Sequence, residues 1–450
     1  MLHKSSPVFD KLLARVSAMP VIDCHEHMVG PEYMVRFREP IAALTAGYFV
    51  GELCSAGADQ ATSLMLQDSE ISTDKKWPAF EAIWKRTEHT AYARVTKLIL
   101  HDVYGEKEMS LAALHRVGEQ LASRDEAFYW RMLDKANIRL ILVDALGWPP
   151  GDFGKFLRGE QTFPDRWRMM IPLPLFHMLP PWFPEGGISA GDWNGLQLIG
   201  SWVNRHITSL DEYIECVFEV LKRAKERGAV GIKDQCAYIR PLSYDVVPRC
   251  DAERIFNRLL ANPCAVLGWP EAKPLDDFLF HQYMRFARDL ELPVQIHTGH
   301  MAGNYNRVDK ANAAHFSTVL ELHQQVRFDL FHGNWPYMGD LLFLVKNYPN
   351  VALDCCWLHI IDPLYAKEML ERAVVTVSHA KIHGFGGDYK DRPEYSAAHL
   401  KIARQVIASA LTDLVERGWL EESEALDIAA DWLFNNPNRF FDLGLEPETR

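Results

Sequence analysis

A short apolar run near the start of the chain ends in two histidines that are separated by one residue. The run is "VIDCHEHMVG" at residues 21–30, and the histidines are His25 and His27. Because side chains along a strand alternate between its faces, both imidazoles would point to one side and Glu26 to the other. Two imidazoles at one strand end suit a divalent metal ion such as zinc, although a structural pair explains the pattern equally well.

Other predicted strands also end on residues that can bind a metal ion. His297, His332 and Asp388 each close an apolar segment, and Lys233 closes another. Taken singly, such a histidine is more often structural than a ligand. In a barrel of parallel strands, however, the carboxyl ends converge on one pocket, where nitrogen and carboxylate oxygen donors suit zinc and similar ions. The combination therefore predicts a metal site.

The elements that would position these residues alternate regularly from about residue 130 onward. Short apolar segments are separated by amphipathic stretches such as 210–229, whose apolar residues follow helical spacing. The predicted strands are 20–25, 138–145, 167–176, 230–238, 293–300, 326–333, 350–358 and 381–388. Eight strands that alternate with helices favour the α/β class and a closed (β/α)8 TIM barrel over an open doubly wound sheet.

Residues 31–130 do not fit this alternation and are mostly helical in pattern. They are expected to form a helical insertion between strands one and two, where a barrel tolerates long loops that wall its site. Residues 178–205, rich in Pro, Gly and Trp, are expected to form another long loop. The chain from 1 to 450 is expected to be a single barrel domain that includes the insertion.

Composition and charge exclude several classes of partner. The net charge is −12 and no Lys/Arg stripe is visible, which disfavours a nucleic-acid partner. The chain contains no apolar run of about 18 residues, so no membrane span is expected. The eight cysteines contain no CxxC pair and the first residues do not resemble a signal peptide, which favours a cytoplasmic protein. A small-molecule substrate is the expected partner, and a homo-oligomer stays open.

Several blocks of sequence together resemble the amidohydrolase superfamily of metal-dependent (β/α)8 barrels. They are "IDCHEH", "GIKDQCAYIRPL", "VQIHTGH", "FDLFHGNWP", "NYPNVALDCC" and "GFGGDYKDRPEY". The last four are similar to the amidohydrolase 2, or amidohydrolase-related, branch. The insertion, with "AYARVTKLILHDVYG", is similar to that of uronate isomerases.

The resemblance implies a divalent metal, zinc by preference with manganese or iron as alternatives, held by His25, His27, His297 and Asp388. It also implies that Asp388 is the proton shuttle. His332 would lie beside the metal, either as a ligand of a second ion or as a group that polarises the substrate.

Lys233 separates two versions of such a site. In binuclear relatives a lysine at this strand is carboxylated and bridges two metals, which requires a neutral amine. In the amidohydrolase 2 branch, which usually binds one metal, Lys233 would instead be a cationic, catalytic contact to the substrate. A lysine that reaches solvent is the third interpretation. The resemblance favours one ion over two.

Two residues of the loop after strand four are candidate substrate contacts. Arg240 could hold a substrate carboxylate with two parallel hydrogen bonds, and Tyr238 lies beside it in "AYIRPL". A surface arginine explains Arg240 equally well. Arg307 is a weaker candidate of the same kind, and His383 stays without an assignment because the glycines after it obscure which way it faces.

Three chemistries fit this set of residues. Hydrolysis of a C–N or C–O bond comes first, because a metal-activated water and a carboxylate suffice for it. Non-oxidative decarboxylation of a small carboxylic acid comes second, and isomerisation of a uronate third. Uronate isomerases carry an arginine two residues after the aspartate of strand eight, where this chain has Lys390. A non-catalytic barrel would lack ligands, and none is missing.

Overall fold

The computed structural model describes residues 4–28, 39–144, 150–161, 163–177, 195–262, 265, 267–390 and 392–448. In these residues eight parallel strands pair in chain order from β1 to β8. Their bounds are β1 Val21–Glu26, β2 Ile138–Asp144, β3 Trp167–Pro172, β4 Gly231–Asp234, β5 Val294–Ile296, β6 Phe328–Leu330, β7 Val351–Asp354 and β8 Ile382–His383. The predicted (β/α)8 barrel is confirmed.

Backbone hydrogen bonds join the first strand to the segment that follows the last one. The amide of Cys24 donates to the carbonyl of Phe385 over 3.0 Å, and the amide of Asp388 donates to the carbonyl of His25 over 2.8 Å. These bonds continue the ladder beyond the two residues of β8 and close the ring of strands. The segment after β8 therefore pairs with β1 and completes the barrel.

Helices surround the strands, and their sequences show why they form. In α12 (Leu210–Glu226) the side chain of Ser209 accepts a hydrogen bond from the amide of Glu212 and caps the helix, as expected for serine at this position. One face of α12 is buried, including Tyr213 and Val217, as the helical spacing predicts. The long helix α19 (Pro393–Glu416) packs against α1, α6, α8 and α18.

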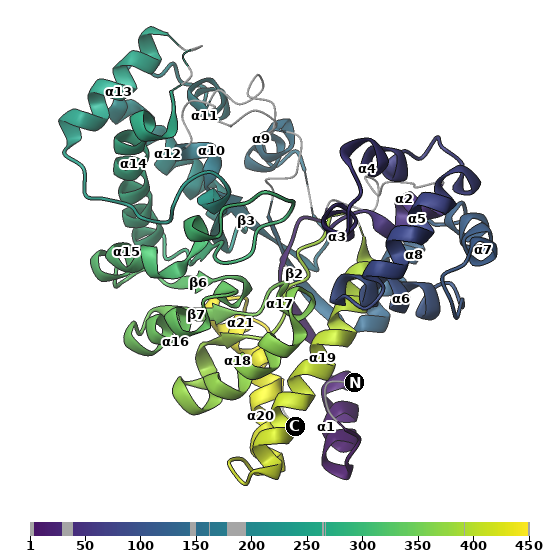
Figure 1. The fold of residues 1–450 in the computed structure, drawn as a ribbon. Coiled ribbons are helices and arrows are strands. Elements are labelled where there is room, and N and C mark those ends of the chain that lie inside the picture. The colour runs from purple at the N-terminus through teal and green to yellow at the C-terminus, as the bar shows by residue number, and fades with distance from the viewer. Residues whose placement is uncertain are drawn as a thin grey trace.

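The remaining helices outside the insertion cover the barrel and its lower end (Figure 1). Their bounds are α1 Pro7–Ala18, α9 Pro150–Arg158, α10 Pro174–His177, α11 Gly195–Val203, α13 Arg249–Ala261, α14 Trp269–Asp289, α15 Ser317–Leu322, α16 Met338–Asn347, α17 Leu358–Ile361, α18 Pro363–Thr376, α20 Glu422–Ala430 and α21 Asn436–Phe440.

The predicted helical insertion between strands one and two is confirmed, and it forms a group of helices on one side of the barrel (Figure 1). Its helices are α2 Pro40–Thr45, α3 Phe49–Ser55, α4 Gln60–Gln67, α5 Thr73–Thr87, α6 Ala91–Asp102, α7 Leu111–Leu121 and α8 Glu126–Ala136. A buried lysine, Lys76, holds the insertion together: its ammonium donates to Glu39 over 2.5 Å and to the carbonyl of Leu66 over 2.9 Å.

Two expectations differ in detail from the structure. The strands are shorter than the apolar segments that predicted them, and β5, β6 and β8 contain only two or three residues. His297 therefore follows β5 directly, and His332 follows β6 after one intervening residue, Phe331. Residues 195–203, expected to belong to a long loop, form helix α11, because the apolar residues of "GLQLIGSWV" pack inward, with Ile199 fully buried. Residues 178–194 of that expected loop lie outside the described residues.

The C-terminal segment packs beneath the first strands. Phe434, Phe441 and Leu443 form a separate apolar cluster with residues of β1, β2 and β3. The strand residues of this cluster are Ile22 of β1, Leu140 and Leu142 of β2, and Met170 of β3. Burial of such large side chains contributes about 1.5–3 kcal/mol each.

Within the described residues, the structure contains no helix that is both long enough and apolar enough to cross a membrane. The cytoplasmic location stays a prediction of the sequence.

The buried ion pair of the insertion gives a testable prediction. Replacing Lys76 by methionine keeps a long side chain at this position but leaves the Glu39 carboxylate buried without its cation. We therefore expect the free energy of unfolding to fall by about 3 kcal/mol. Urea denaturation of Lys76→Met measures this loss. The neighbouring Lys75 is exposed, and Lys75→Met should leave stability within about 0.5 kcal/mol. Equal effects of both substitutions would contradict this account.

Candidate metal centre

Three side-chain atoms from opposite ends of the chain meet at the mouth of the barrel. His25 Nε2, His27 Nε2 and Asp388 Oδ1 are each 3.3 Å from the other two. A shift in strand register between Asp23 and Glu26 accompanies this arrangement in β1. In a tetrahedral zinc site with bonds of about 2.0 Å, neighbouring ligand atoms lie about 3.3 Å apart. The triangle thus has the spacing of three donors around one ion.

The protonation states of these groups suit a metal. Burial lowers the pKa of His25 to about 3, so its imidazole is neutral at pH 7. Burial also acts on His27, but hydrogen bonding to Asp388 and the charge of Asp144 raise its pKa above the usual value. Although burial alone would raise the pKa of Asp388, hydrogen bonding to both histidines holds it well below its usual range. A cation placed among these three atoms would relieve the crowding of their lone pairs.

His332 lies beside this triangle, and His297 lies behind His332. His332 Nε2 is 3.9 Å from Asp388 Oδ2 and 3.2 Å from His297 Nδ1. The other nitrogen of His332, Nδ1, lies 2.8 Å from the carbonyl of Cys356, which favours the tautomer that carries its proton on Nδ1. Burial lowers the pKa of His332 to about 3. His297 Nε2 lies 2.8 Å from the carbonyl of His300, so its contacts are with His332 and the main chain.

Lys233 and Tyr238 also reach this group. The Lys233 ammonium lies 4.5 Å from the ring centre of Phe331 and makes a long, 3.5 Å hydrogen bond to the carbonyl of Asp234. Burial is the main reason why the pKa values of His25 and His332 are low, and the charge of Lys233 lowers both further. The ring of Tyr238 lies 4.8 Å from that of His297, and its hydroxyl accepts a hydrogen bond from the amide of Ala302.

The guanidinium of Arg240 is not available to bind a substrate, because other residues of the fold already pair with it. The side chain is fully buried and pairs with Asp276 and Asp277, each over 2.5 Å. It also donates to two main-chain carbonyls and lies against the rings of Tyr244 and Trp269. These contacts satisfy Arg240 within the fold, so we propose no role for it in the site. The guanidinium of Arg307 forms an exposed ion pair with Asp309.

Two residues of the site were missed by sequence reasoning. Asp144, at the end of β2, is fully buried with its Oδ2 3.8 Å from His27 Nδ1, on the side where a carboxylate orients a metal-binding imidazole. The sequence could have pointed to Asp144, because this residue stands at the end of a predicted strand, as His297 does. Cys356 forms a possible ligand group with His332 and Asp388, and the cysteine spacing in the sequence gave no sign of it.

A buried carboxyl group and three glycines hold the turn that carries Asp388. Glu26 accepts hydrogen bonds from the amide of Tyr389 and from the hydroxyl of Ser396, each over 2.5 Å. A Cβ on Gly387 would lie 2.0 Å from Glu26 Oε1, while one on Gly386 would meet Cys356 and one on Gly384 would meet Trp432. The glycines of "HGFGGD" therefore allow close packing on three sides.

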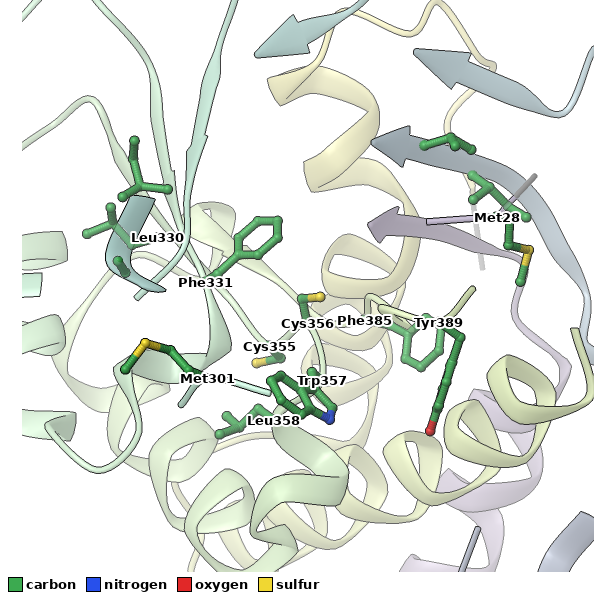
Figure 2. Close-up of a cluster of buried hydrophobic side chains, with 14 of the residues drawn as sticks. Met28, Met301, Leu330, Phe331, Cys355, Cys356, Trp357, Leu358, Phe385 and Tyr389 are labelled. Carbon is green, nitrogen blue, oxygen red and sulfur yellow. The ribbon is translucent and has the colours of Figure 1, made fainter. Parts of the chain in front are cut away.

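The helical insertion and an aromatic cluster complete the surroundings. Tyr48, from the insertion, donates its hydroxyl hydrogen to the carbonyl of Asp388 and stacks on Trp357 at 4.0 Å between ring centres. Figure 2 shows Trp357 with Cys356, Phe331 and Tyr389 in the buried cluster around the site. The backbones of His332, Trp357 and Asp388 all have positive φ angles, a conformation that costs about 1–3 kcal/mol and concentrates at functional sites.

Comparison with known proteins identifies a family that the chain matches over half of its length. The sequence model of a family described as amidohydrolase matches residues 210–442, more than half of the chain. The chain belongs to the amidohydrolase family. The resemblance seen in the sequence is thus confirmed, and with it the prediction of an enzyme.

Two curated relatives match parts of this amidohydrolase. Protein fluG of Emericella nidulans is 27% identical over 49% of this chain and 26% of its own length. A uronate isomerase of Phenylobacterium zucineum is 27% identical over 43% of this chain and 43% of its own length. The chain therefore spans less than half the length of either relative.

A solved structure extends the likeness over nearly the whole amidohydrolase. The uronate isomerase of Thermotoga maritima superposes with a TM-score of 0.77 and covers 97% of this chain and 98% of its own, at 14% identity. At this level of identity the likeness shows the fold, including a barrel with high helical content.

The packing of Gly387 gives a prediction for the site. In Gly387→Ala the new methyl group would overlap Glu26, so the turn that carries Asp388 must shift. We expect a loss of about 2 kcal/mol in stability together with reduced metal content, measured by thermal unfolding and elemental analysis. Gly339 has open space where a Cβ would lie, and Gly339→Ala should change neither. Full metal content in Gly387→Ala would show that Glu26 and the turn do not hold Asp388 in place.

Proposed function

We propose that this amidohydrolase is a metal-dependent hydrolase that holds one divalent ion, zinc by preference, and cleaves a C–N or C–O bond of a small-molecule substrate. The observation that carries the proposal is the triangle of His25, His27 and Asp388 with its mutual distances of 3.3 Å. A neutral imidazole at His25 and an ionised carboxylate at Asp388 are the ligand forms that a metal requires.

The donors that would hold the ion are His25, His27 and Asp388, with His297 as the fourth ligand that the family resemblance implies. Asp144 would orient His27 from its Nδ1 side. A divalent ion in such a site supplies Lewis acidity and lowers the pKa of bound water to about 7. Manganese and iron accept the same donors, so elemental analysis decides the identity of the ion.

Asp388 is proposed as the group that moves the proton. Its Oδ1 faces the two histidines and its Oδ2 faces His332. Its lowered pKa keeps the carboxylate ionised, and its two oxygens face different sides of the pocket, so that a proton could pass through it from water to a leaving group. His332 keeps its own proton on Nδ1 against the Cys356 carbonyl, so its Nε2, which lies 3.2 Å from His297 Nδ1, is the nitrogen that accepts a hydrogen bond.

Lys233 is proposed as a contact to the substrate. Its ammonium is buried among the histidines, where a fixed positive charge stabilises negative charge that develops on a substrate oxygen. Tyr238, whose ring packs on His297, would form part of the same wall. Buried aromatic side chains, among them Trp357 and Phe331, lie around the site (Figure 2), and burial strengthens electrostatic interactions.

A uronate isomerase activity is the second candidate, because relatives of that name match the sequence and the fold. The helical insertion, which reaches Asp388 through Tyr48, is a shared feature of the likeness. Against it, Lys390 is exposed at the position where the isomerases carry an arginine. Hydrolysis is therefore preferred, with decarboxylation of a small carboxylic acid as a further outcome of the assays below.

The test of the proposal combines metal analysis with a substrate panel. Protein purified without added metal should contain close to one equivalent of ion per chain, and His25→Ala should lose it and at least about 100-fold in kcat/KM. The panel contains amides, esters, lactones, carboxylic acids and uronates. The exposed His115 on α7 provides the control variant His115→Ala, which should match the wild type. Activity that survives both a chelator and His25→Ala would overturn the proposal.

Lys233→Met distinguishes the two roles of this lysine. If the ammonium contacts the substrate, the metal content should stay unchanged while KM rises by about tenfold, equivalent to about 1.4 kcal/mol of binding. If Lys233 were instead carboxylated and bridged two ions, the wild type would hold two equivalents and the variant would lose metal. Elemental analysis of both proteins with steady-state kinetics separates these cases.

A further inference from the structure

A second group of metal-binding residue types lies inside the barrel, apart from the centre described above. Cys24 comes from β1, Asp329 from β6, Asp354 from β7 and His383 from β8, and all four side chains are fully buried. Gln295 of β5 bridges the carbonyl of Cys24 and the carboxylate of Asp329. Strands β1, β5 and β6 are not all neighbours, so these side chains meet across the barrel interior. Such interiors are ordinarily filled by branched apolar residues.

The donor atoms of this group are close to one another. One ligand atom each from Cys24, Asp354 and His383 lies within 4.8 Å of the other two. His383 Nδ1 is 2.9 Å from Asp329 Oδ1 and 3.7 Å from Asp354 Oδ2. Thiolate, imidazole and carboxylate are the ligand types of structural zinc sites, and four of them are the usual number.

Two polar atoms of the group have no hydrogen-bond partner. They are Asp354 Oδ2 and His383 Nε2, both on fully buried side chains. A buried polar atom without a partner costs about 1–3 kcal/mol, and native proteins rarely keep one without a reason. Asp354 Oδ2 lies 3.7 Å from His383 Nδ1, beyond hydrogen-bonding distance but within reach of a shared ion.

The chemistry of the group points the same way. A thiol, an imidazole and two carboxyl groups meet out of contact with water. A divalent cation is the species that takes the place of the protons on such groups.

We propose that Cys24, Asp354 and His383, with Asp329 as the fourth donor, form a second and structural metal site for a thiophilic divalent ion such as zinc. Its thiolate distinguishes it from the centre of His25, His27 and Asp388, where the donors are nitrogen and oxygen. The proposal does not depend on which reaction the enzyme catalyses.

An ion in this position would support the ends of the strands that carry the catalytic centre. Cys24 directly precedes His25. Asp354 Oδ1 accepts a hydrogen bond from the amide of Cys356 over 2.6 Å, and the carbonyl of Cys356 in turn fixes His332 Nδ1. One ion would thus tie four strands together directly beneath the side chains that act on the substrate.

Cobalt substitution tests the proposal, because cobalt bound by a thiolate has a charge-transfer absorption band in the near ultraviolet that nitrogen and oxygen donors do not produce. Since the site is buried, the full-length protein is produced in cells grown with cobalt instead of zinc. We expect the band in the wild type and its loss in Cys24→Ser, with a loss of about one equivalent of metal. The double variant His25→Ala/His27→Ala should keep the band.

The neighbouring buried cysteines provide matched controls. Cys355 lies outside the group, and Cys356 lies beside His332 and Asp388, so Cys355→Ser and Cys356→Ser should both retain the band. Absence of the band in the wild-type cobalt protein would overturn the proposal, as would its loss in Cys356→Ser alone. If Cys24→Ser does not fold, anomalous diffraction from wild-type crystals at the zinc edge still tests the proposal. An anomalous peak is expected between Cys24, Asp354 and His383. The absence of a peak at that position would overturn the proposal.

Discussion

The contact between the first strand and the turn after the last strand is the constraint on which the site depends. Among the hydrogen bonds that close the ring of strands, the one from the amide of Asp388 to the carbonyl of His25 also sets the carboxylate against the two histidines. Glu26 fixes the same turn from the other face of β1 through the amide of Tyr389. Barrel closure and formation of the donor triangle are therefore the same structural event.

The site is costly for the protein to maintain. His25, His332 and Asp388 are buried, and His332 and Asp388 also have left-handed backbone conformations. Burial of polar groups is unfavourable unless they are paired, and the left-handed backbone adds strain. A cation between the donors would recover part of this cost. The surrounding barrel, with its large apolar core, supplies the rest.

Sequence reasoning reached the barrel and the main donors because topology alone brings strand ends together. His25, His27 and Asp388 follow from that rule without any knowledge of the loops between them. Asp144 obeys the same rule but was overlooked, because an aspartate after a strand is also an ordinary turn residue. Arg240 was predicted as a substrate contact but pairs with Asp276 and Asp277 instead. This pairing depends on how a loop folds back onto α14, which spacing along the chain does not reveal.

Since the donors come from the two extremities of the barrel, nearly the whole polypeptide separates His25 from Asp388. A nascent chain whose final strand is still inside the ribosomal tunnel presents the histidine pair but not the carboxylate. The complete coordination set arises only after synthesis has passed the last strand and that strand has joined β1. Any translation product that stops before β8 would emerge without the means to retain its ion.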